Sequence, residues 1–427
     1  MSRLAWSALI GVLIAGETCP VASHNLDPIS TYDARRQQLI DAEENIAAGA
    51  SLEKNFTAAE VVADRIIRSA KALALAPEQP DGGQPIASQH FLDAKPRIDK
   101  AELFPMLQSM PKGAVLHTHP DALQDVAWTV QQTTYDDRLW VCGDVGTGQL
   151  DNTIQFQYSD SPTGPTGYWD PLVPFNEDSC TWKQVTALRN ASGDHDKFDR
   201  ELVEDLSMMT ANRPPYKSQS EAWTKFQNCF GRISGIYFFA ENYAAIMTAA
   251  FKAMRDDGVQ HLEFRQMLAP GGIYFLNGTV LPVDATLEAV QRVADAVGIT
   301  VRVQVAEMRA SDPATVAKGL QEANRLMAKY PDLVVGFDLV GQEDAGRPLI
   351  DFLPELLNVS DAELGQHTPP FYFHAGETDE VGLGPDLNLY DAILLNSTRI
   401  GHGYSLARHP MLRQMAQKQV RFLHISP

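Results

Sequence analysis

The sequence predicts an α/β protein in which parallel strands alternate with helices around a barrel. Helical patterns such as 285–297 and 314–330 separate several short runs of β-branched or aromatic residues. Strands and helices that alternate at this spacing are typical of parallel βαβ units with right-handed crossovers. The candidate strands are 113–119, 259–264, 299–305, 333–339, 371–376, 398–403 and 420–425. A closed barrel of the TIM type needs an eighth strand, so we expect a barrel that lacks its last strand.

Two further regions are predicted beside the barrel, which we assign to residues 91–427. Residues 23–90 form an N-terminal helical extension, because 32–75 is rich in Ala, Gln, Glu and Leu and repeats apolar residues at helical spacing. Gly49 and Ser51 mark a break within it. An insert at about 136–186 follows the first strand and looks rich in loops.

The N-terminus has the pattern of a secretory signal peptide over residues 1–22. Arg3 precedes an apolar run, Leu4–Gly16, that is too short to span a bilayer, and small residues follow near a cleavage point at Ala22. The alternative is a buried N-terminal helix. N-x-[ST] sequons agree with secretion, since each is a potential glycan site. They lie at Asn55, Asn190, Asn277, Asn358 and Asn396.

Charge and cysteine content narrow the function. The net charge of −19 argues against partners with a nucleic-acid backbone or an anionic membrane surface. Cys19 leaves with the signal peptide, whereas Cys142 and Cys180 bracket a Gly/Pro/Asp-rich stretch that a disulfide would stabilise in an oxidising compartment. Cys229 lies in a helical segment and is interpreted as a buried free thiol.

Histidines lie at the carboxyl ends of predicted strands, the face of a β/α barrel where catalytic residues collect. His117 and His119 are two apart, so a strand would direct both imidazoles to the same side. His374 ends the fifth strand and would complete three nitrogen ligands, a set that suits zinc. The alternatives are a surface or core pair for the first two and an ordinary loop histidine for the third.

Other polar groups end neighbouring strands. Glu377 follows His374 closely enough to exchange a proton with substrate or water, although a Glu that starts a helix is the alternative. His402, between two glycines, could orient or deprotonate an attacking water. Gly341, which follows the fourth strand, could offer its backbone N–H to a ligand. Together these features favour an enzyme.

Four segments resemble, in order and spacing, the motifs of the adenosine deaminase family. They are MPKGAVLHTHPDA (110–122), GFDLVGQE (336–343), HAGET (374–378) and RIGHG (399–403). The helices of 32–75 and the Cys142–Cys180 insert are similar to the secreted subgroup, the adenosine deaminase growth factors. The resemblance covers nearly the whole chain.

The resemblance implies zinc-dependent hydrolysis of adenosine or 2′-deoxyadenosine to inosine or its deoxy form and ammonia. It implies that the N-terminal helices could join two copies of the chain into a homodimer. By position in the motifs, the resemblance assigns zinc ligation to His117, His119 and His374. It assigns protonation of purine N1 to Glu377 and activation of the attacking water to His402. It assigns a backbone contact with the purine to Gly341 and a contact with the ribose to Asp121. Pro120 stands between His119 and that Asp, where the subgroup has none.

One motif of the family has no counterpart here. The family takes a fourth metal ligand, an Asp, from its eighth strand, and no Asp or Glu follows His402 in this sequence. We therefore expect the 427-residue chain to be a poor deaminase. Two alternatives stay open: a catalytically inactive, growth-factor-like secreted protein, or a hydrolase of another purine.

Overall fold

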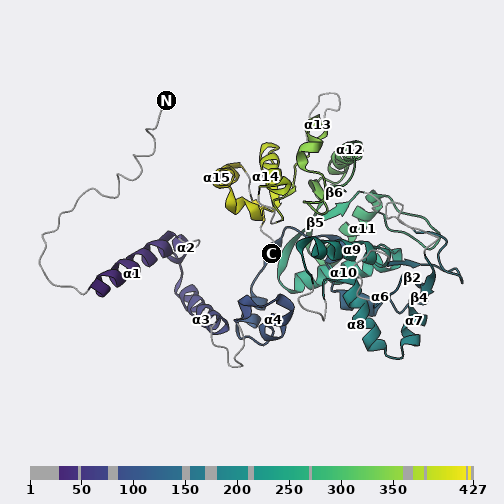
Figure 1. Cartoon of the computed structure of the whole chain (residues 1–427), viewed down its shortest axis with the longest axis horizontal. Coiled ribbons are helices and arrows are strands. Elements are labelled where there is room, and N and C mark those ends of the chain that lie inside the picture. Colours follow the sequence, from purple (N-terminus) through teal and green to yellow (C-terminus); the bar gives the residue numbers. More distant parts are fainter. Residues whose placement is uncertain are drawn as a thin grey trace, which may run out of the picture. The chain divides into compact units, whose positions relative to one another are not determined.

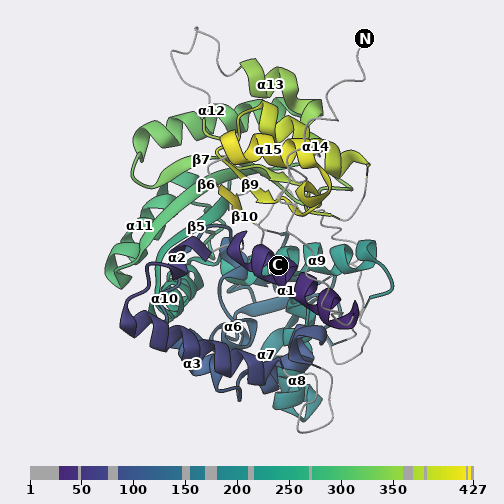
Figure 2. The ribbon, with the colours of Figure 1, turned by 90° about the vertical axis from the view of Figure 1, so that its left-hand side faces the viewer.

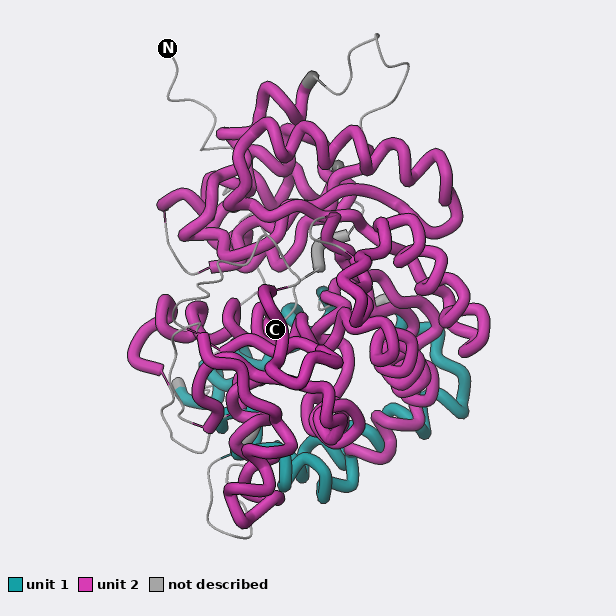
Figure 3. The backbone as a smooth tube through the Cα atoms, turned by 90° about the vertical axis from the view of Figure 1, so that its right-hand side faces the viewer, with its two compact units in different colours: residues 1–103 teal, residues 104–427 magenta. Residues whose placement is uncertain are grey.

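The computed structural model describes the chain at residues 28–46, 50–75, 85–146, 154–168, 180–209, 216–268, 272–358, 369–378, 382–419 and 422–424. It divides into two compact units, Met1–Leu103 and Phe104–Pro427 (Figure 3). The sequence placed this boundary near residue 90. The predicted signal peptide, 1–22, lies outside the described residues.

Unit 1 is helical in its described parts, as the composition of 32–75 predicts. Thr57 begins the best-defined helix with a capping box, in which its side chain accepts from the backbone of Glu60 and the Glu60 side chain accepts from the backbone of Thr57. Ser51, expected in a break, lies inside a short helix instead. The helices are α1 (Pro28–Ile46), α2 (Ala50–Glu53), α3 (Ala58–Ala74), the 3-10 turn η1 (Ile86–Ser88) and α4 (Phe91–Ile98).

Unit 2 contains all seven predicted strands, and each pairs in parallel with its neighbours. The first sheet has the order β1 (Gly113–Val115), β5 (Val259–Met267), β6 (Thr300–Met308) and β7 (Val334–Val340). The second has the order β10 (Phe422–His424), β9 (Arg399–His402) and β8 (His374–Ala375). A parallel bridge between Phe337 and Phe371 joins the two sheets into one curved series of strands. The α/β prediction is confirmed.

Helices cover the outer side of these strands. Figure 2 shows α11 and α12 along β6 and β7, where they bury residues such as Leu287 and Leu320 against the sheet. Along the chain, the strands of the two sheets alternate with helices, several of which are labelled in Figure 1. They are α5 (Leu103–Ser109), α9 (Gln219–Tyr237), α10 (Ala240–Asp256), α11 (Val283–Val297), α12 (Pro313–Lys329), α13 (Leu353–Asn358), α14 (Gly384–Leu394) and α15 (Pro410–Gln419), with 3-10 turns η2 (Pro120–Ala122), η4 (Leu349–Phe352) and η5 (Tyr404–Arg408).

The series of strands curves until its two ends approach each other. Arg399, on β9, donates from Nη1 to the carbonyl of Leu116 beyond β1, at 3.1 Å. The same guanidinium pairs with Glu263 of β5 at 2.8 Å, inside the curve. This curvature is what places residues from the ends of β1, β8 and β9 around one point.

The insert after β1 differs from the loop-rich segment that the sequence predicted. Its described residues contain an antiparallel sheet with the order β3 (Gln155–Tyr158), β2 (Leu139–Cys142), β4 (Trp182–Gln184). Along the chain, α6 (Val126–Thr133) precedes this sheet, and α7 (Val185–Ser192) and α8 (His195–Leu206) follow it. Leu139, Val141 and Phe156 are fully buried, and they belong to the same apolar core as the strands of the parallel sheets. Its strands were missed because they are short and lie between Gly- and Pro-rich segments.

The predicted disulfide is present between Cys142 and Cys180, whose Cα atoms lie 5.5 Å apart. Cys229 in α9 is a free thiol, but it is half-buried rather than fully buried. Of the sequon residues, Asn55, Asn190, Asn277 and Asn396 are exposed. Among the described residues, no helix is both long and apolar enough to cross a bilayer.

Candidate active site

His117 and His119 lie just beyond β1, which is shorter than predicted and ends at Val115. The segment nevertheless stays against β5, because Thr118 donates from Oγ1 to the carbonyl of Glu263 and accepts from the backbone N–H of Arg265. With Thr118 turned to β5, the two imidazoles come to lie 5.8 Å apart between ring centroids.

His374 forms β8 with Ala375 and is almost fully buried. Its Nδ1 lies 2.8 Å from Oδ2 of Asp338 on β7, and its backbone N–H donates to the other carboxylate oxygen at 3.1 Å. A carboxylate this close to Nδ1 favours the tautomer with the proton on Nδ1, which leaves Nε2 for a ligand.

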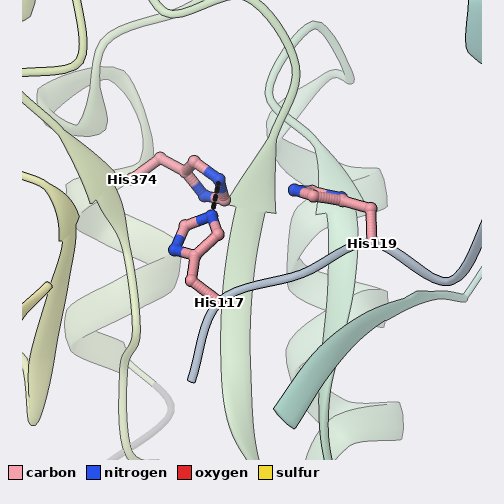
Figure 4. A group of neighbouring side chains, drawn as sticks. All are labelled: His117, His119 and His374. Atoms are coloured by element: carbon pink, nitrogen blue, oxygen red, sulfur yellow. Dashed lines mark hydrogen bonds between the residues drawn. The ribbon is translucent and has the colours of Figure 1, made fainter. Parts of the chain in front are cut away.

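Three ring nitrogens converge at this point. His117 and His374 face each other through their Nε2 atoms at 2.8 Å, and His119 is directed toward the pair (Figure 4). One ligand atom from each residue lies within 4.8 Å of the others. Burial lowers the pKa of His117 and His374 and lowers that of His119 to about 4, so all three are neutral. Three neutral imidazoles fit a zinc ion.

Glu377 and His402 form a second pair beside these histidines. Oε1 of Glu377 lies 3.2 Å from Nε2 of His402, and both side chains are largely buried. Burial, followed by repulsion from Glu343, raises the pKa of Glu377 to about 8. A carboxyl group that keeps its proton at neutral pH can act as a general acid.

The backbone around His402 is what turns its ring toward the site. His402 has φ of 65° and Gly403 has φ of 62°, so two successive residues adopt the left-handed conformation. A non-glycine residue in this region is uncommon and often has a functional reason. The turn brings the ring of His402 to 4.7 Å from that of His117.

Gly401 is required by the closeness of His117. A Cβ at this position would lie 2.7 Å from Cε1 of His117 and 3.4 Å from Cα of His374. The backbone of β8 cannot move aside, so the ring of His117 would have to shift. We expect Gly401→Ala to lower zinc affinity at least about tenfold, measured by titration with a competing chelator. Gly384→Ala is the control for a general glycine effect away from the histidines, since Gly384 has no positive φ and an added Cβ there meets no atom within 4 Å.

Asp121 and Gly341 lie near the same ends of the strands. Asp121 is in the 3-10 turn η2 directly after His119, and burial raises its pKa to about 7. Gly341 follows β7 with φ of 103°, a conformation that favours glycine.

Several residues of this region were not assigned by sequence. Asp338, which is fully buried, also accepts from Nε of Arg265 at 3.0 Å, so His374, Asp338 and Arg265 form a chain. Arg309 donates from Nη2 to the carbonyl of His374 at 2.6 Å. The motif GFDLVGQE contains Asp338, and its position at a strand end was the signal that could have revealed it.

A parallel β/α barrel with three neutral histidines at the carboxyl ends of its strands, and a protonated carboxyl group beside them, has the arrangement of a metal-dependent hydrolase. A model of the adenosine deaminase family matches residues 196–426, more than half of the chain, and one of the adenosine/AMP deaminase N-terminal region matches residues 11–107. The chain belongs to the adenosine deaminase family.

Individual relatives agree with this assignment. Adenosine deaminase of Lutzomyia longipalpis is 33% identical over 93% of this chain and 74% of its own length. Adenosine deaminase 2 of Sus scrofa is 30% identical over 99% of this chain and 79% of its own. A solved structure of Arabidopsis ADAL complexed with GMP is 13% identical, with a TM-score of 0.40 over 74% of this chain and 70% of that one.

Proposed function

We propose that this protein is a secreted, zinc-dependent deaminase that converts adenosine or 2′-deoxyadenosine to the corresponding inosine and ammonia. The observation that carries the proposal is the position of the Glu377–His402 pair beside three neutral, converging imidazoles. A metal alone would fit many hydrolases. A protonated carboxyl group beside the metal ligands adds a donor for a basic ring nitrogen, as purine deamination requires.

His117, His119 and His374 would hold the zinc ion, which supplies a Lewis acid that makes a water molecule nucleophilic. Glu377 donates its proton to purine N1, which draws electrons from C6. His402 accepts the proton of the attacking water, and its contact with Glu377 keeps its ring in place. After water adds at C6, the amino group takes the proton of the new C6 hydroxyl and leaves as ammonia. Proton transfer from His402 to Glu377, which lie in contact, then restores both groups.

Asp338 and Arg265 would keep His374 in the orientation that ligation needs. The carboxylate of Asp338 lies 2.8 Å from Nδ1 of this histidine and accepts from its backbone N–H, and Arg265 neutralises the carboxylate charge. Carboxylates that orient a metal-binding histidine also raise its basicity. Asp121 is proposed to contact the ribose, and Gly341 the purine, by their positions beside these groups.

The decisive experiment measures metal and turnover together. The purified chain should contain stoichiometric zinc and release ammonia from adenosine and 2′-deoxyadenosine, and adenine and AMP should be poorer substrates. A folded chain with neither zinc nor turnover would instead support a growth-factor-like protein. Zinc with turnover of another purine only would leave the metal site in place and change the substrate.

Secretion and assembly are part of the same proposal. The exposed sequon residues and the Cys142–Cys180 disulfide support passage through an oxidising compartment. Expression in a eukaryotic cell should place the glycosylated chain in the medium. Light scattering of that material would test the homodimer predicted through the N-terminal helices.

A further inference from the structure

The carboxylate of Glu343 is buried behind the turn that carries Glu377. It lies three residues beyond the end of β7 and is 2% exposed. Its Oε1 accepts from the backbone N–H of Gly376 at 2.9 Å, and its Oε2 accepts from that of Glu377 at 2.6 Å. One carboxylate therefore satisfies two consecutive N–H groups, one at the buried Gly376 and one at the partly buried Glu377. Hydrogen bonds to an ionised acceptor are stronger than neutral ones.

Glu343 is itself held from a third side. Asn388, fully buried on α14, donates from Nδ2 to Oε1 of Glu343 at 2.9 Å. The Oδ1 of Asn388 accepts from the backbone N–H of Leu349 at 2.8 Å, which fixes the orientation of the amide. Asn388 of α14 therefore holds Glu343, and Glu343 in turn holds the backbone of the turn at Gly376 and Glu377.

The turn at Gly376 and Glu377 is also confined on the side opposite Glu343. Gly376 has φ of 67°, and a Cβ there would lie 2.5 Å from Oγ of Ser405 and 3.1 Å from the side chain of Leu389. Without Glu343, the N–H groups of the buried Gly376 and the partly buried Glu377 would lose their acceptor, and Ser405 and Leu389 close the other side of the turn. Unsatisfied buried donors are costly, so the turn would change its conformation.

Glu343 also acts on Glu377 through its charge. Burial is the largest cause of the raised pKa of Glu377, and Glu343 is the next, with Asp338 and Asp344 raising it further and Arg309 opposing them. His402 is the remaining titratable group in contact. The residue that holds the turn therefore also favours the protonated form of the acid.

We propose that Glu343, fixed by Asn388, is a positioning residue that sets where the carboxyl group of Glu377 lies. It touches neither metal ligands nor substrate and works through the peptide N–H groups of Gly376 and Glu377. The inference rests on the proposed function for its catalytic consequence. Its structural content, a carboxylate that protects two named amides, does not depend on the reaction.

Two substitutions of Glu343 test the length of its side chain and its charge separately. Glu343→Gln keeps the length, removes the charge, and turns an NH₂ group toward one of the two N–H donors. Glu343→Asp keeps the charge but is one methylene shorter, so it cannot reach both amides. Glu307→Gln is the matched control, because Glu307 is a buried carboxylate on the neighbouring β6, packed against Gly319 of α12, with a pKa that burial raises to about 7.

The measurements on the full chain are amide exchange, zinc content and kinetics. Exchange at Gly376 and Glu377 should accelerate at least about tenfold in both Glu343 variants, with zinc content unchanged. kcat should fall about tenfold or more while KM stays within about twofold. The alkaline limb of the pH profile should move to lower pH in Glu343→Gln alone, because only that variant removes the charge that raises the pKa of Glu377.

Three results would overturn the inference. They are unchanged exchange in both variants, the same changes in Glu307→Gln, or loss of zinc together with turnover. If Glu343→Gln does not fold, Glu343→Asp still decides whether the amides lose protection. A wild-type chain that releases no ammonia from adenosine would contradict the proposed function, whereas the exchange data would still decide whether Glu343 holds the turn.

Discussion

Replacing Glu377 by Gln is expected to lower kcat for adenosine by about 10²–10⁴ while zinc content stays the same. The amide has nearly the shape of the acid and can still contact His402, but it has no proton of suitable acidity for purine N1. Since His117, His119 and His374 are untouched, the metal should remain. Ammonia release and metal analysis of the same preparation check both statements.

The pH dependence of turnover is a second test of the role of Glu377. Burial raises the pKa of Glu377 to about 8, so the group is protonated at neutral pH and loses its proton as the pH rises through that value. Wild-type turnover should therefore fall on the alkaline side, and Glu377→Gln should lack this limb. Loss of zinc from the variant would mean that Glu377 is a ligand. Turnover near that of wild type would mean that another group supplies the proton.

The barrel was predictable because its strands and helices have distinct local patterns. Helices such as α11 and α12 keep apolar residues at 3.6-residue spacing, and β6 and β7 are continuous runs between them. The histidines were predictable from their placement at strand ends. His117 and His119 differ from the prediction in lying beyond the shortened β1, where contacts with β5 replace strand pairing.

The groups that support the site could not be read from local patterns. Asp338 and Glu343 belong to one recognised motif, yet the sequence drew attention only to Gly341 between them. Their partners, His374 and the 376–377 amides, lie more than 30 residues away along the chain. A single sequence shows which residues end each strand, whereas the register between β7 and β8 decides which of them meet.

A comparison of His374→Ala with His402→Ala should separate the metal ligands from the residues around them. The two rings lie 5.3 Å apart between centroids, so proximity alone does not assign their roles. His374 has its Nδ1 held by Asp338 and its Nε2 turned to His117, which is the arrangement of a ligand. His402 has its Nε2 turned to Glu377, away from that role.

We therefore expect His374→Ala to be purified with little zinc and no turnover, because two imidazoles hold the ion far more weakly than three. It should also leave Asp338 and Arg265 without their histidine, but paired with each other, so the fold should persist. His402→Ala should keep its zinc and lose about a hundredfold or more in kcat. Metal analysis after dialysis, circular dichroism and ammonia release on both variants make the comparison. Retention of zinc by His374→Ala together with its loss from His402→Ala would exchange the two assignments, and would require the ligand set to be built from His117, His119 and His402.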